Sequence, residues 1–544
     1  MFIEPVFGKK FFGREEILAT LQKRVTALKG GYRQNLALAG PMLAGKSSIL
    51  RHFLKGINDS EIIPLYIEMT GEDFKVFCTR FMASLLYRYL KSKSQKCEGD
   101  FEGLKKACRV SIPQTVKGMD GISKALRQKK EDAAYEKLLA LTSTFKGETG
   151  KSCIVILDEF QSLSEFRLKK PFQTFGKFIM VQKNTMYIVS SSQKTLLRDI
   201  LSKKLSLLFG NFEVLEVEGF DTQTARSFVC DKIKSADSCE NIINYLIQVS
   251  QGSPFYLEVL ANKFSELAKP KDSKRGNKEC LLDAFATLLY ESEGVLNQYF
   301  TNNINFFLEK RGRKKFIPIL LSLANGNSTI KAVQQDLGKA DKDLGPKLQR
   351  LQEMDLVYNS GIFYKISEKL FEYWLKYVYS LKTKSMIDEM DIKYLEFKRL
   401  IEEDYNEYCE FAKKPVTEII TDLFKSFKGE KVRINMNGRK MPRFTTVLGK
   451  KLSKNVYEVT GDVGSKRWIC HIKEGDIADE HDIGNLWNQK LDDDKTKIAR
   501  KIFISFKGIE QNAFLLAKEQ NIWVWDTHEI NRILRLFGKF ELVQ

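Results

Sequence analysis

The sequence lacks any long apolar run. No stretch of its 544 residues approaches the roughly 18 consecutive apolar residues that a membrane-spanning helix requires. Near the start, Glu4 and Pro5 interrupt the region where a secretory signal peptide needs a continuous apolar core. The composition, 43% hydrophobic and 29% charged, is typical of a globular protein. We therefore expect a cytoplasmic protein with no membrane segment.

Metal-binding patterns of cysteine and histidine are also missing. No two of the nine cysteines form a CxxC pair, and the four histidines show no HExxH spacing. Such spacings mark structural zinc sites and zinc hydrolases. Without them, the cysteines are expected to be reduced structural thiols. We predict neither a structural metal nor a disulfide framework.

Acidic residues are in deficit. The 69 Asp and Glu face 88 Lys and Arg, which gives a net charge of +19. This excess favours a polyanionic partner such as DNA, because Lys and Arg that neutralise phosphates release condensed counterions. A Lys-rich proteome produces the same balance without such a partner. The location of the basic residues has to decide between the two.

A phosphate-binding loop is the strongest motif present. Residues 40–47, GPMLAGKS, match GxxxxGK[ST] at every fixed position, between a strand-like and a helix-like segment. In this motif backbone N–H groups bind phosphate, Lys46 reaches the β- and γ-phosphates, and Ser47 ligates Mg²⁺. The residues expected to contact the nucleotide are Gly40, Pro41, Met42, Leu43, Ala44, Gly45, Lys46, Ser47 and Ser48.

Two acidic residues follow a buried-strand pattern farther along the chain. The run CIVIL at residues 153–157 suits a central parallel strand, and it ends in Asp158 and Glu159. Ligands of open α/β sheets bind at this carboxyl edge. Asp158 is expected to hold the Mg²⁺ shell, and Glu159 to polarise the attacking water as a general base. Loop and acid pair together predict nucleotide hydrolysis.

Another strand, MYIVSSS at residues 186–192, ends in three serines and precedes a helix with Arg198. Polar residues at the tip of a strand beside the loop strand are placed to sense the γ-phosphate. Capping of the following helix is an equal alternative for these serines. Arg198 is a candidate finger toward a neighbouring subunit, which would imply a homo-oligomer.

These motifs together resemble a family. The box FFGREEILATLQKRV at residues 11–25 is similar to the one that precedes the P-loop in AAA+-related ATPases of the archaeal-ATPase and STAND type. QGSPFYLEVL at residues 251–260 resembles the GxP element of their helical lid. The resemblance, over residues 1 to about 380, implies ATP as the nucleotide, with Arg14 near the adenine and Pro254 in a nucleotide-sensing lid. The absence of a GTPase-style NKxD motif agrees with ATP.

Residues 90–150 form a Lys-rich insertion ahead of the acidic strand. Its pattern predicts helices. A solvated helical surface is the simpler interpretation of such charge, and a contact for nucleic acid is the alternative.

Residues 314–366 follow the order of a winged helix-turn-helix. Helices are predicted at 315–324, up to about 337, and from about 342 to 354, before two strands that turn at 359–361. The third helix keeps its apolar residues on one stripe and offers Lys342, Lys347 and Arg350 to solvent or to a DNA major groove. Winged helices also act as protein-interaction modules, so a protein partner stays open.

The C-terminal segment resembles a nuclease fold. Residues 405–544 are predicted to form a helix, hairpin strands, a helix, a strand, a helix and a strand, an α/β order of the restriction-endonuclease kind. The archaeal-ATPase family that this chain resembles often carries a PD-(D/E)xK-like domain at this place.

The nuclease-like site departs from that pattern. Its chemistry needs two carboxylates for Mg²⁺ and a lysine for the attacking water. Lys473 stands at the lysine position, but His471 replaces the expected glutamate, and histidine is a poor Mg²⁺ ligand. Either the site still cleaves, or the fold only binds DNA or a partner. The candidate residues are Glu418, Glu458, Asp462, His471 and Lys473.

The expected architecture is α/β, with an AAA+-like P-loop core. We predict an ATPase core at residues 1–205, a helical lid at 206–305, a winged helix at 306–382, a helical linker at 383–404 and a nuclease-like α/β domain at 405–544.

Two functions stay open from the sequence. The first is an ATP- and Mg²⁺-dependent switch that couples nucleotide state to DNA binding. The second is a STAND-type signalling or defence ATPase whose C-terminal domain is a regulated effector or binds a protein partner. A small-molecule P-loop kinase is disfavoured, because it leaves the acidic strand and the two appended domains unexplained.

Overall fold

The computed structural model describes residues 4–69, 71, 73–95, 100–205, 211–233, 239–268, 276–309, 314–338, 343–384, 390–434, 437–490 and 496–543. Internal contacts divide the chain into two compact units. The first unit is Met1–Thr224 with Ser253–Phe255 and Glu353–Asp355, and the second contains Ala225–Gly252, Tyr256–Gln352 and Leu356–Gln544. No helix of the described ranges is apolar and long enough to cross a membrane.

A five-stranded parallel sheet forms the base of the first unit, in the order β2-β3-β4-β1-β5. All positions of β1 are buried, as the continuous apolar run of a central parallel strand requires. The carboxyl ends of β1, β3 and β4 therefore lie side by side at one edge. The strands are β1 (Asn35–Ala39), β2 (Ile62–Glu68), β3 (Ser152–Asp158), β4 (Thr185–Ser191) and β5 (Phe212–Glu216).

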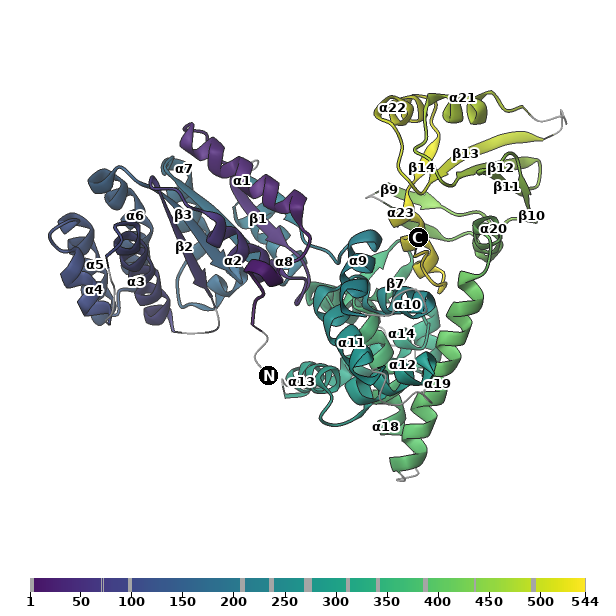
Figure 1. Ribbon diagram of the computed structural model, residues 1–544, viewed down its shortest axis with the longest axis horizontal. Helices are drawn as coiled ribbons and strands as arrows, with labels where there is room; N and C mark the ends of the chain where they lie inside the picture. Colours follow the sequence, from purple (N-terminus) through teal and green to yellow (C-terminus); the bar gives the residue numbers. More distant parts are fainter. Residues whose placement is uncertain are drawn as a thin grey trace. The chain divides into compact units, whose positions relative to one another are not determined.

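Helices cover both faces of this sheet (Figure 1). Apolar side chains of α1 and α2 pack against one face, and those of α3, α6 and α7 against the other. The Lys-rich insertion is helical, as predicted. The helices of this part are α1 (Glu15–Lys29), α2 (Lys46–Gly56), α3 (Phe74–Ser92), α4 (Phe101–Cys108), α5 (Pro113–Arg127), α6 (Glu131–Thr149), α7 (Pro171–Val181) and α8 (Lys194–Asp199).

The chain after β5 is helical up to a short hairpin. Three helices, α14 to α16, precede the antiparallel strands β6 and β7, which is the predicted order. The helices are α9 (Thr222–Lys232), α10 (Glu240–Ser250), α11 (Pro254–Leu267), α12 (Asn277–Phe285), α13 (Val295–Glu309), α14 (Ile317–Ala324), α15 (Ile330–Asp336), α16 (Leu344–Glu353), α17 (Lys369–Tyr373), α18 (Ser380–Lys384) and α19 (Met390–Ala412), and the strands are β6 (Val357–Ser360) and β7 (Phe363–Ile366).

The C-terminal residues form a second sheet, in the order β10-β11-β12-β13-β14. The first three strands are antiparallel, and β13 and β14 continue in parallel. Apolar residues of α20 and α23 cover one face, and those of α21 and α22 the other. The elements are α20 (Val416–Ser426), β8 (Lys431–Ile434), β9 (Asn437–Lys440), β10 (Thr446–Lys451), β11 (Val456–Val463), β12 (Lys466–Lys473), α21 (Glu480–Asn488), β13 (Lys497–Ser505), α22 (Gln511–Glu519), β14 (Trp523–Trp525) and α23 (Thr527–Leu536).

The β6–β7 hairpin is packed into this C-terminal core. Phe363 belongs to the same buried cluster as α20 and α23, and its ring lies 5.2 Å from that of Phe537. The backbone N–H of Ile362 donates to the carbonyl of Lys431 at 3.0 Å. Gly361 has a φ of +66°, and a Cβ there would lie 1.8 Å from the same carbonyl oxygen, so only glycine fits this turn.

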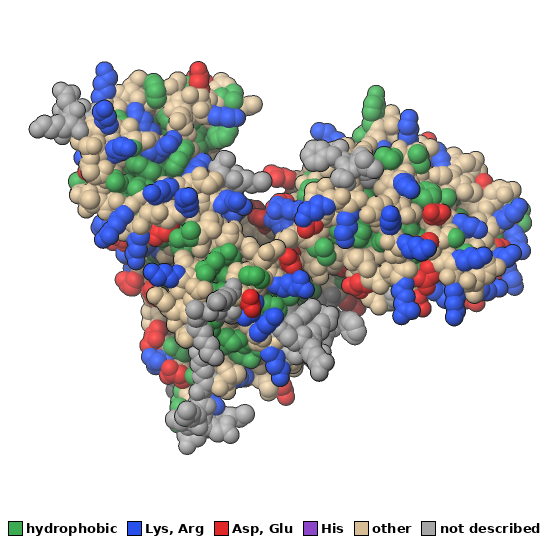
Figure 2. All heavy atoms as spheres, turned by 180° about the vertical axis from the view of Figure 1, so that it is seen from behind, with side chains coloured by type: hydrophobic (Ala, Val, Ile, Leu, Met, Phe, Trp, Pro, Cys, Tyr) green, Lys and Arg blue, Asp and Glu red, His purple; other side chains and the backbone are tan. Residues whose placement is uncertain are grey.

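Lys and Arg side chains are spread over much of the face drawn in Figure 2, where Asp and Glu are fewer. The picture matches the net charge of +19.

Candidate functional site

The phosphate-binding loop connects the buried strand β1 to helix α2, which begins at Lys46. Two glycines are required by its geometry. A Cβ on Gly40 would lie 2.1 Å from the carbonyl oxygen of Val217, and Gly45 has a φ of +94°. Leu43 also has a positive φ of 63°. The loop is thus held in a tight turn at the N-terminus of α2, where backbone N–H groups are available to an anion.

Lys46 lies inside the loop. Its side chain is buried, and Nζ donates to the carbonyl oxygens of Gly40 at 2.9 Å and Pro41 at 2.7 Å. Burial lowers the pKa of Lys46, while the nearby Glu159 and Asp158 act in the opposite direction. The ammonium is bound only to neutral carbonyl groups, so a phosphate would gain a charged partner without breaking an ion pair.

Asp158, at the end of β3, accepts hydrogen bonds from hydroxyl groups of three other elements. Its carboxylate accepts from Ser47 at 2.6 Å, from Tyr66 at 2.5 Å, and from Ser190. The carboxylate of Asp158 and the hydroxyl of Ser47 are hard oxygen donors, the ligand type that Mg²⁺ prefers, so the residues present fit this ion. Burial, with the Asp158 charge adding to it, raises the pKa of Tyr66, which stays a proton donor.

Glu159 follows in a left-handed backbone conformation, with a φ of 56°. One carboxylate oxygen accepts from the Ser192 hydroxyl at 2.7 Å and from the Ser192 backbone N–H at 3.2 Å. It also accepts from the side chain of Gln161. A non-glycine residue in this region is strained, and such strain concentrates at functional sites.

The three serines at the end of β4, of which Ser192 directly follows the strand, do not cap the next helix with their side chains. Ser190 bonds Asp158, Ser192 bonds Glu159, and the Ser191 hydroxyl accepts from the Gln193 backbone N–H at 3.0 Å. The capping residue of α8 is Gln193, which makes no side-chain cap. The capping interpretation is therefore wrong, and Ser190 and Ser192 contact the acid pair instead.

Arg14 joins the loop to the segment after β5. Its guanidinium donates to the carbonyls of Ala44 at 3.2 Å and Glu218 at 2.6 Å, and lies over the Phe220 ring. Burial lowers the pKa of Arg14. The predicted place beside adenine stays a prediction. Of the other predicted loop residues, Met42 has an exposed side chain. The hydroxyl of Ser48 accepts a hydrogen bond from the backbone N–H of Val6 at 3.0 Å.

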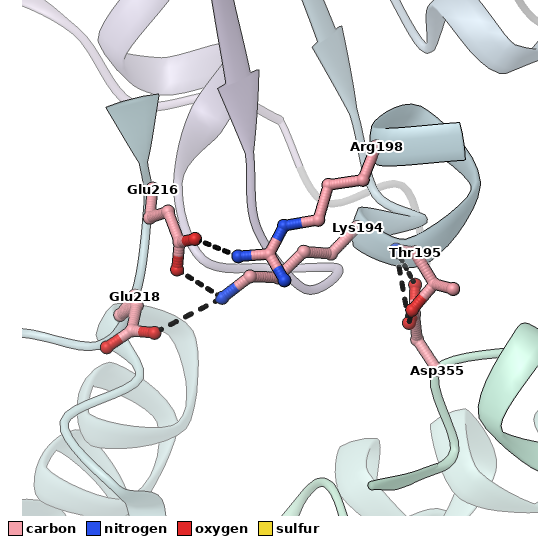
Figure 3. Close-up of polar contacts among 6 residues, drawn as sticks. All are labelled: Lys194, Thr195, Arg198, Glu216, Glu218 and Asp355. Carbon is pink, nitrogen blue, oxygen red and sulfur yellow. Dashed lines mark hydrogen bonds and ion pairs between the residues drawn. The ribbon is translucent and has the colours of Figure 1, made fainter. Parts of the chain in front are cut away.

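Arg198 is ion-paired within the chain (Figure 3). It bonds Glu216 at the end of β5, and Lys194 bonds the same carboxylate and reaches Glu218 at 3.3 Å. An arginine offered to a neighbouring subunit would have to leave Glu216. Pro254, the other residue taken from the family resemblance, begins α11 within the first compact unit.

A carboxylate from a distant part of the sequence takes the place of the missing cap on α8. The backbone N–H of Thr195 donates to Asp355 at 3.2 Å, and its hydroxyl donates at 2.5 Å (Figure 3). Burial raises the pKa of Asp355, although the bonds from Thr195 act against it. Asp355 lies two residues after the end of α16. Nothing in the local sequence signals this contact.

The second candidate site lies on β11 and β12. Their antiparallel register places Glu458 directly opposite His471, and both side chains are buried. His471 Nε2 lies 2.8 Å from Gln489 Oε1 and 3.3 Å from Glu458. Gln489 also donates to Glu458, and Lys450 pairs with it at 2.9 Å. Burial would raise the pKa of Glu458, but bonds from His471, Gln489 and Lys450 outweigh it and lower that pKa to about 2.

Lys473 is turned to a different carboxylate. Its Nζ lies 2.5 Å from Asp482, which belongs to the capping box of α21. The charges of the site thus satisfy one another. Within the ranges that the structure describes, no group of three His, Cys, Asp or Glu side chains is arranged to hold a metal ion.

Two predicted members of this site lie elsewhere. Asp462 forms a bidentate pair with Arg467, at 2.6 and 2.9 Å, four residues along β11 from Glu458. Glu418 is exposed on α20, which covers the opposite face of the sheet from Glu458. The register, which the sequence left open, selects Glu458 as the acid beside His471.

On α16, the apolar stripe is buried as predicted, through Leu344, Leu348 and Leu351. Lys347 is half-buried and Arg350 is exposed. Lys342 lies outside the described residues.

A family model described as an AAA ATPase domain matches residues 10–170. The matched segment contains the loop, Lys46, Ser47 and the Asp158–Glu159 pair. No curated protein matches the chain. The chain therefore contains a P-loop AAA ATPase domain, and its enzymatic activity is ATP hydrolysis.

Several solved structures are similar to this chain at low identity. The Walker-type ATPase PABY2304 of Pyrococcus abyssi is 18% identical over 68% of this chain and 97% of its own, with a TM-score of 0.48. The ORC2 protein of Aeropyrum pernix is 12% identical over 70% and 98%, with a TM-score of 0.43. The RuvB Holliday junction branch migration motor of Thermotoga maritima is 13% identical over 68% and 98%, with a TM-score of 0.33. At these values the likeness carries no argument about partners.

Proposed function

We propose that this ATPase is a molecular switch that couples its nucleotide state to the binding of DNA. The observation that carries the proposal is a bonded series of residues that starts at the acid pair. Glu159 bonds Ser192, Thr195 follows three residues later, and Thr195 bonds Asp355, just after α16. A change at the γ-phosphate thus has a short route to the end of the helix that we assign to DNA.

The proposed chemistry assigns each group near the loop one task. ATP supplies the phosphate, and Mg²⁺ is held by Ser47 and Asp158. Lys46 exchanges its bonds to the loop carbonyls for the β- and γ-phosphates. Glu159 accepts the proton of the attacking water, which requires that its bond to Ser192 loosen at that step.

Ser192 would then report on the nucleotide. While Glu159 is bonded to Ser192, its carboxylate is held away from a general-base role. A γ-phosphate that attracts the serine side chain would free Glu159. The two states differ by a few hydrogen bonds, a scale of about 1–3 kcal/mol that suits a switch.

We assign DNA binding to α14–α16 with β6–β7, as a winged helix-turn-helix. Its third helix buries one apolar stripe and leaves Arg350 exposed, with Lys347 beside it. Lys and Arg on such a helix neutralise phosphates, and neighbouring Gln side chains can bond base edges.

We further propose that the C-terminal domain has a PD-(D/E)xK-like fold that does not cleave DNA. Among the residues that the structure describes, Glu458 is the one carboxylate bonded to Lys450, His471 and Gln489, and Lys473 is paired with Asp482. A metal ion would have to displace a lysine and a histidine to reach Glu458. This supports a binding role.

The proposal is tested by the ATPase rate of the purified full-length protein with and without duplex DNA. We expect DNA to change the rate several-fold, and Lys347→Gln with Arg350→Gln to abolish both the change and most DNA binding. The double variant Lys117→Gln with Lys124→Gln, exposed on α5, removes the same charge and should behave as wild type. A rate indifferent to DNA in all three proteins refutes the coupling.

One observation favours the alternative, a signalling ATPase that binds a protein partner. The β6–β7 hairpin is packed into the C-terminal core and is not a free wing. If the α16 double variant binds DNA as wild type does and hydrolyses ATP normally, this second function is favoured. Deletion of residues 405–544 is a poor test, because it would remove the residues that bury Phe363 and would expose this side chain to solvent.

A further inference from the structure

The segment with the highest density of positive charge lies in the C-terminal domain and does not include α16. Residues 425–454 contain ten Lys or Arg and one acid, Glu430. Their net charge is 10 − 1 = +9, almost half of the +19 of the whole chain. The segment includes β8, β9 and β10.

The hairpin of β8 and β9 presents these cations on one side. Lys431, Arg433 and Lys440 are exposed, whereas Val432 and Ile434 between them are fully buried. This is the alternation of a strand with one face in the core. None of the three cations forms an ion pair with a described residue.

Two of the cations are placed against each other. Lys431 lies directly opposite Lys440 in the antiparallel register. Like charges in this position destabilise a strand pair by a few tenths of a kcal/mol, or more, unless an anion lies between them. Arg439 continues the basic strand, with its guanidinium over the Trp523 ring at 4.3 Å, and Arg500 lies over the same ring at 4.4 Å.

The hairpin adjoins β6 through its backbone. The Ser360 hydroxyl donates to the carbonyl of Arg433 at 2.8 Å and accepts from its N–H at 3.1 Å. The β6–β7 hairpin has one cation of its own, Lys365, and that side chain is buried. At the β6–β7 turn Gly361 and Ile362 are exposed, but the turn carries no cation and is bonded to the backbone of Lys431 of β8.

We propose that the β8–β9 hairpin binds the phosphate backbone of duplex DNA and serves as the charged wing that β6–β7 cannot be. The inference rests on the proposed DNA function. Lys431, Arg433 and Lys440 each contact one phosphate, and the strain of the opposed pair is relieved when DNA is bound.

Duplex DNA fits better than an anionic membrane. Binding at a lipid surface needs exposed aromatic or aliphatic residues among the cations. Among the described residues of this hairpin, the apolar side chains are Val432 and Ile434, and both are buried.

The test uses the full-length triple variant Lys431→Gln, Arg433→Gln, Lys440→Gln, whose contacts with β6–β7 are preserved because they use the backbone. Its affinity for duplex DNA is measured across a salt series. We expect at least a tenfold weaker Kd at physiological salt and a log–log salt slope shallower by about 2 to 3, since each phosphate contact contributes about 0.9. The charge-matched control is Lys117→Gln, Lys124→Gln, Arg127→Gln on α5, whose affinity should stay within about twofold of wild type.

Different failures have different meanings. Equal losses in the triple variant and its control reveal a general charge effect and overturn the inference. An unchanged triple variant, together with loss of binding in Lys347→Gln with Arg350→Gln, overturns the inference and leaves the proposed function standing. A wild-type protein that binds no DNA at all removes the proposed function itself. Equal binding of single-stranded RNA or of anionic vesicles by the same hairpin overturns the assignment to duplex DNA.

A measurement on the wild-type protein tests the inference even if the triple variant does not fold. Acetylation of Lys431 and Lys440 by a limiting reagent, read by mass spectrometry, should slow several-fold when duplex DNA is added. Lys117 and Lys124 should react at an unchanged rate. Unchanged reactivity of the hairpin lysines contradicts the inference.

Discussion

The molecule contains two places where acidic residues and a lysine lie close together at strand ends, and they differ in how their charges are satisfied. Around the P-loop, the described partners of Asp158 are three hydroxyl groups and the backbone N–H of Glu159, and those of Lys46 are two carbonyl oxygens. In the C-terminal domain, Glu458 is paired with Lys450 and hydrogen-bonded to His471 and Gln489, and Lys473 is paired with Asp482.

The difference shows how a site that can accept a charged ligand differs from a site whose charges are satisfied by the protein itself. Neutral partners are replaced at little cost when a cation or phosphate arrives, because no ion pair is broken. Partners of opposite charge already neutralise the charges of the site, and separating a buried charge from its partner costs free energy. The acids of the first site are therefore poised for Mg²⁺ and nucleotide, whereas those of the second are held by the protein itself.

The largest expected effect is on the first site. Lys46→Ala should lower the ATP hydrolysis rate by about a thousandfold, because the developing charge on the γ-phosphate loses its cation. The rate is measured by phosphate release from purified full-length protein. Lys55→Ala, exposed on the same helix, is the control and should retain the wild-type rate. A Lys46→Ala protein that turns over normally would remove the contrast between the two sites.

One substitution should give the second site the ability to bind a metal ion that we assign to the first. His471→Glu places a second buried carboxylate opposite Glu458, which should cost about 2–3 kcal/mol through like-charge repulsion and desolvation. Thermal unfolding should therefore occur at a temperature several degrees lower, and millimolar Mg²⁺ or Mn²⁺ should restore part of the loss. His471→Gln, which adds no charge, should show no response to metal. A His471→Glu protein without metal response would mean that other features of the site also exclude the ion.

The lowered pKa of Glu458 predicts that the stability of the folded chain depends on pH. The folded state favours ionised Glu458, so its stabilising contribution is complete above the ordinary carboxyl value near 4.5. That contribution is lost as the pH falls toward about 2. Denaturant unfolding, followed by tryptophan fluorescence between those values, should become less pH-dependent in Glu458→Gln. Equal slopes for variant and wild type would show that Glu458 is not held in the way its contacts imply.

The smallest expected effect concerns the contact that leads out of the first site. Asp355→Asn keeps a residue that tolerates the φ of 56° but removes the charge bonded to Thr195. We expect α8 to open about 0.5–1 kcal/mol more readily. Faster hydrogen exchange of the α8 amides would show it, with the exposed Asp336→Asn as the control. Unaltered exchange would indicate that Asp355 contributes nothing to α8.

The P-loop and the acid pair were predictable because their determinants are local. A fixed glycine spacing, a lysine and a serine, and then an apolar strand ending in two acids, each act within a few residues. The order of helix, hairpin strands, helix, strand, helix and strand in the C-terminal region followed from the same kind of periodic signal, but the closing helix α23 was not predicted. In these regions local propensity and tertiary structure agree.

Other features depend on contacts that have no local signal. Tyr66 reaches Asp158 across the sheet, over 92 positions of sequence, and Asp355 reaches Thr195 over 160. The choice of Glu458 over Asp462 depends on strand register, which periodicity alone does not fix. From the sequence, the serines at the end of β4 suited capping and sensing equally, and the contacts of Ser190 with Asp158 and of Ser192 with Glu159 exclude capping.

The contact between Phe363 and Phe537 sets a condition on how this protein is made. When the ribosome has completed β7, the aromatic ring that completes this packing lies 174 residues farther along the message. At a synthesis rate of about 5–20 residues per second, roughly 10–30 seconds pass between the synthesis of Phe363 and that of Phe537. A nascent chain with an apolar hairpin exposed for that long is a natural client for chaperones, and a premature stop in the C-terminal domain would damage the preceding domain as well.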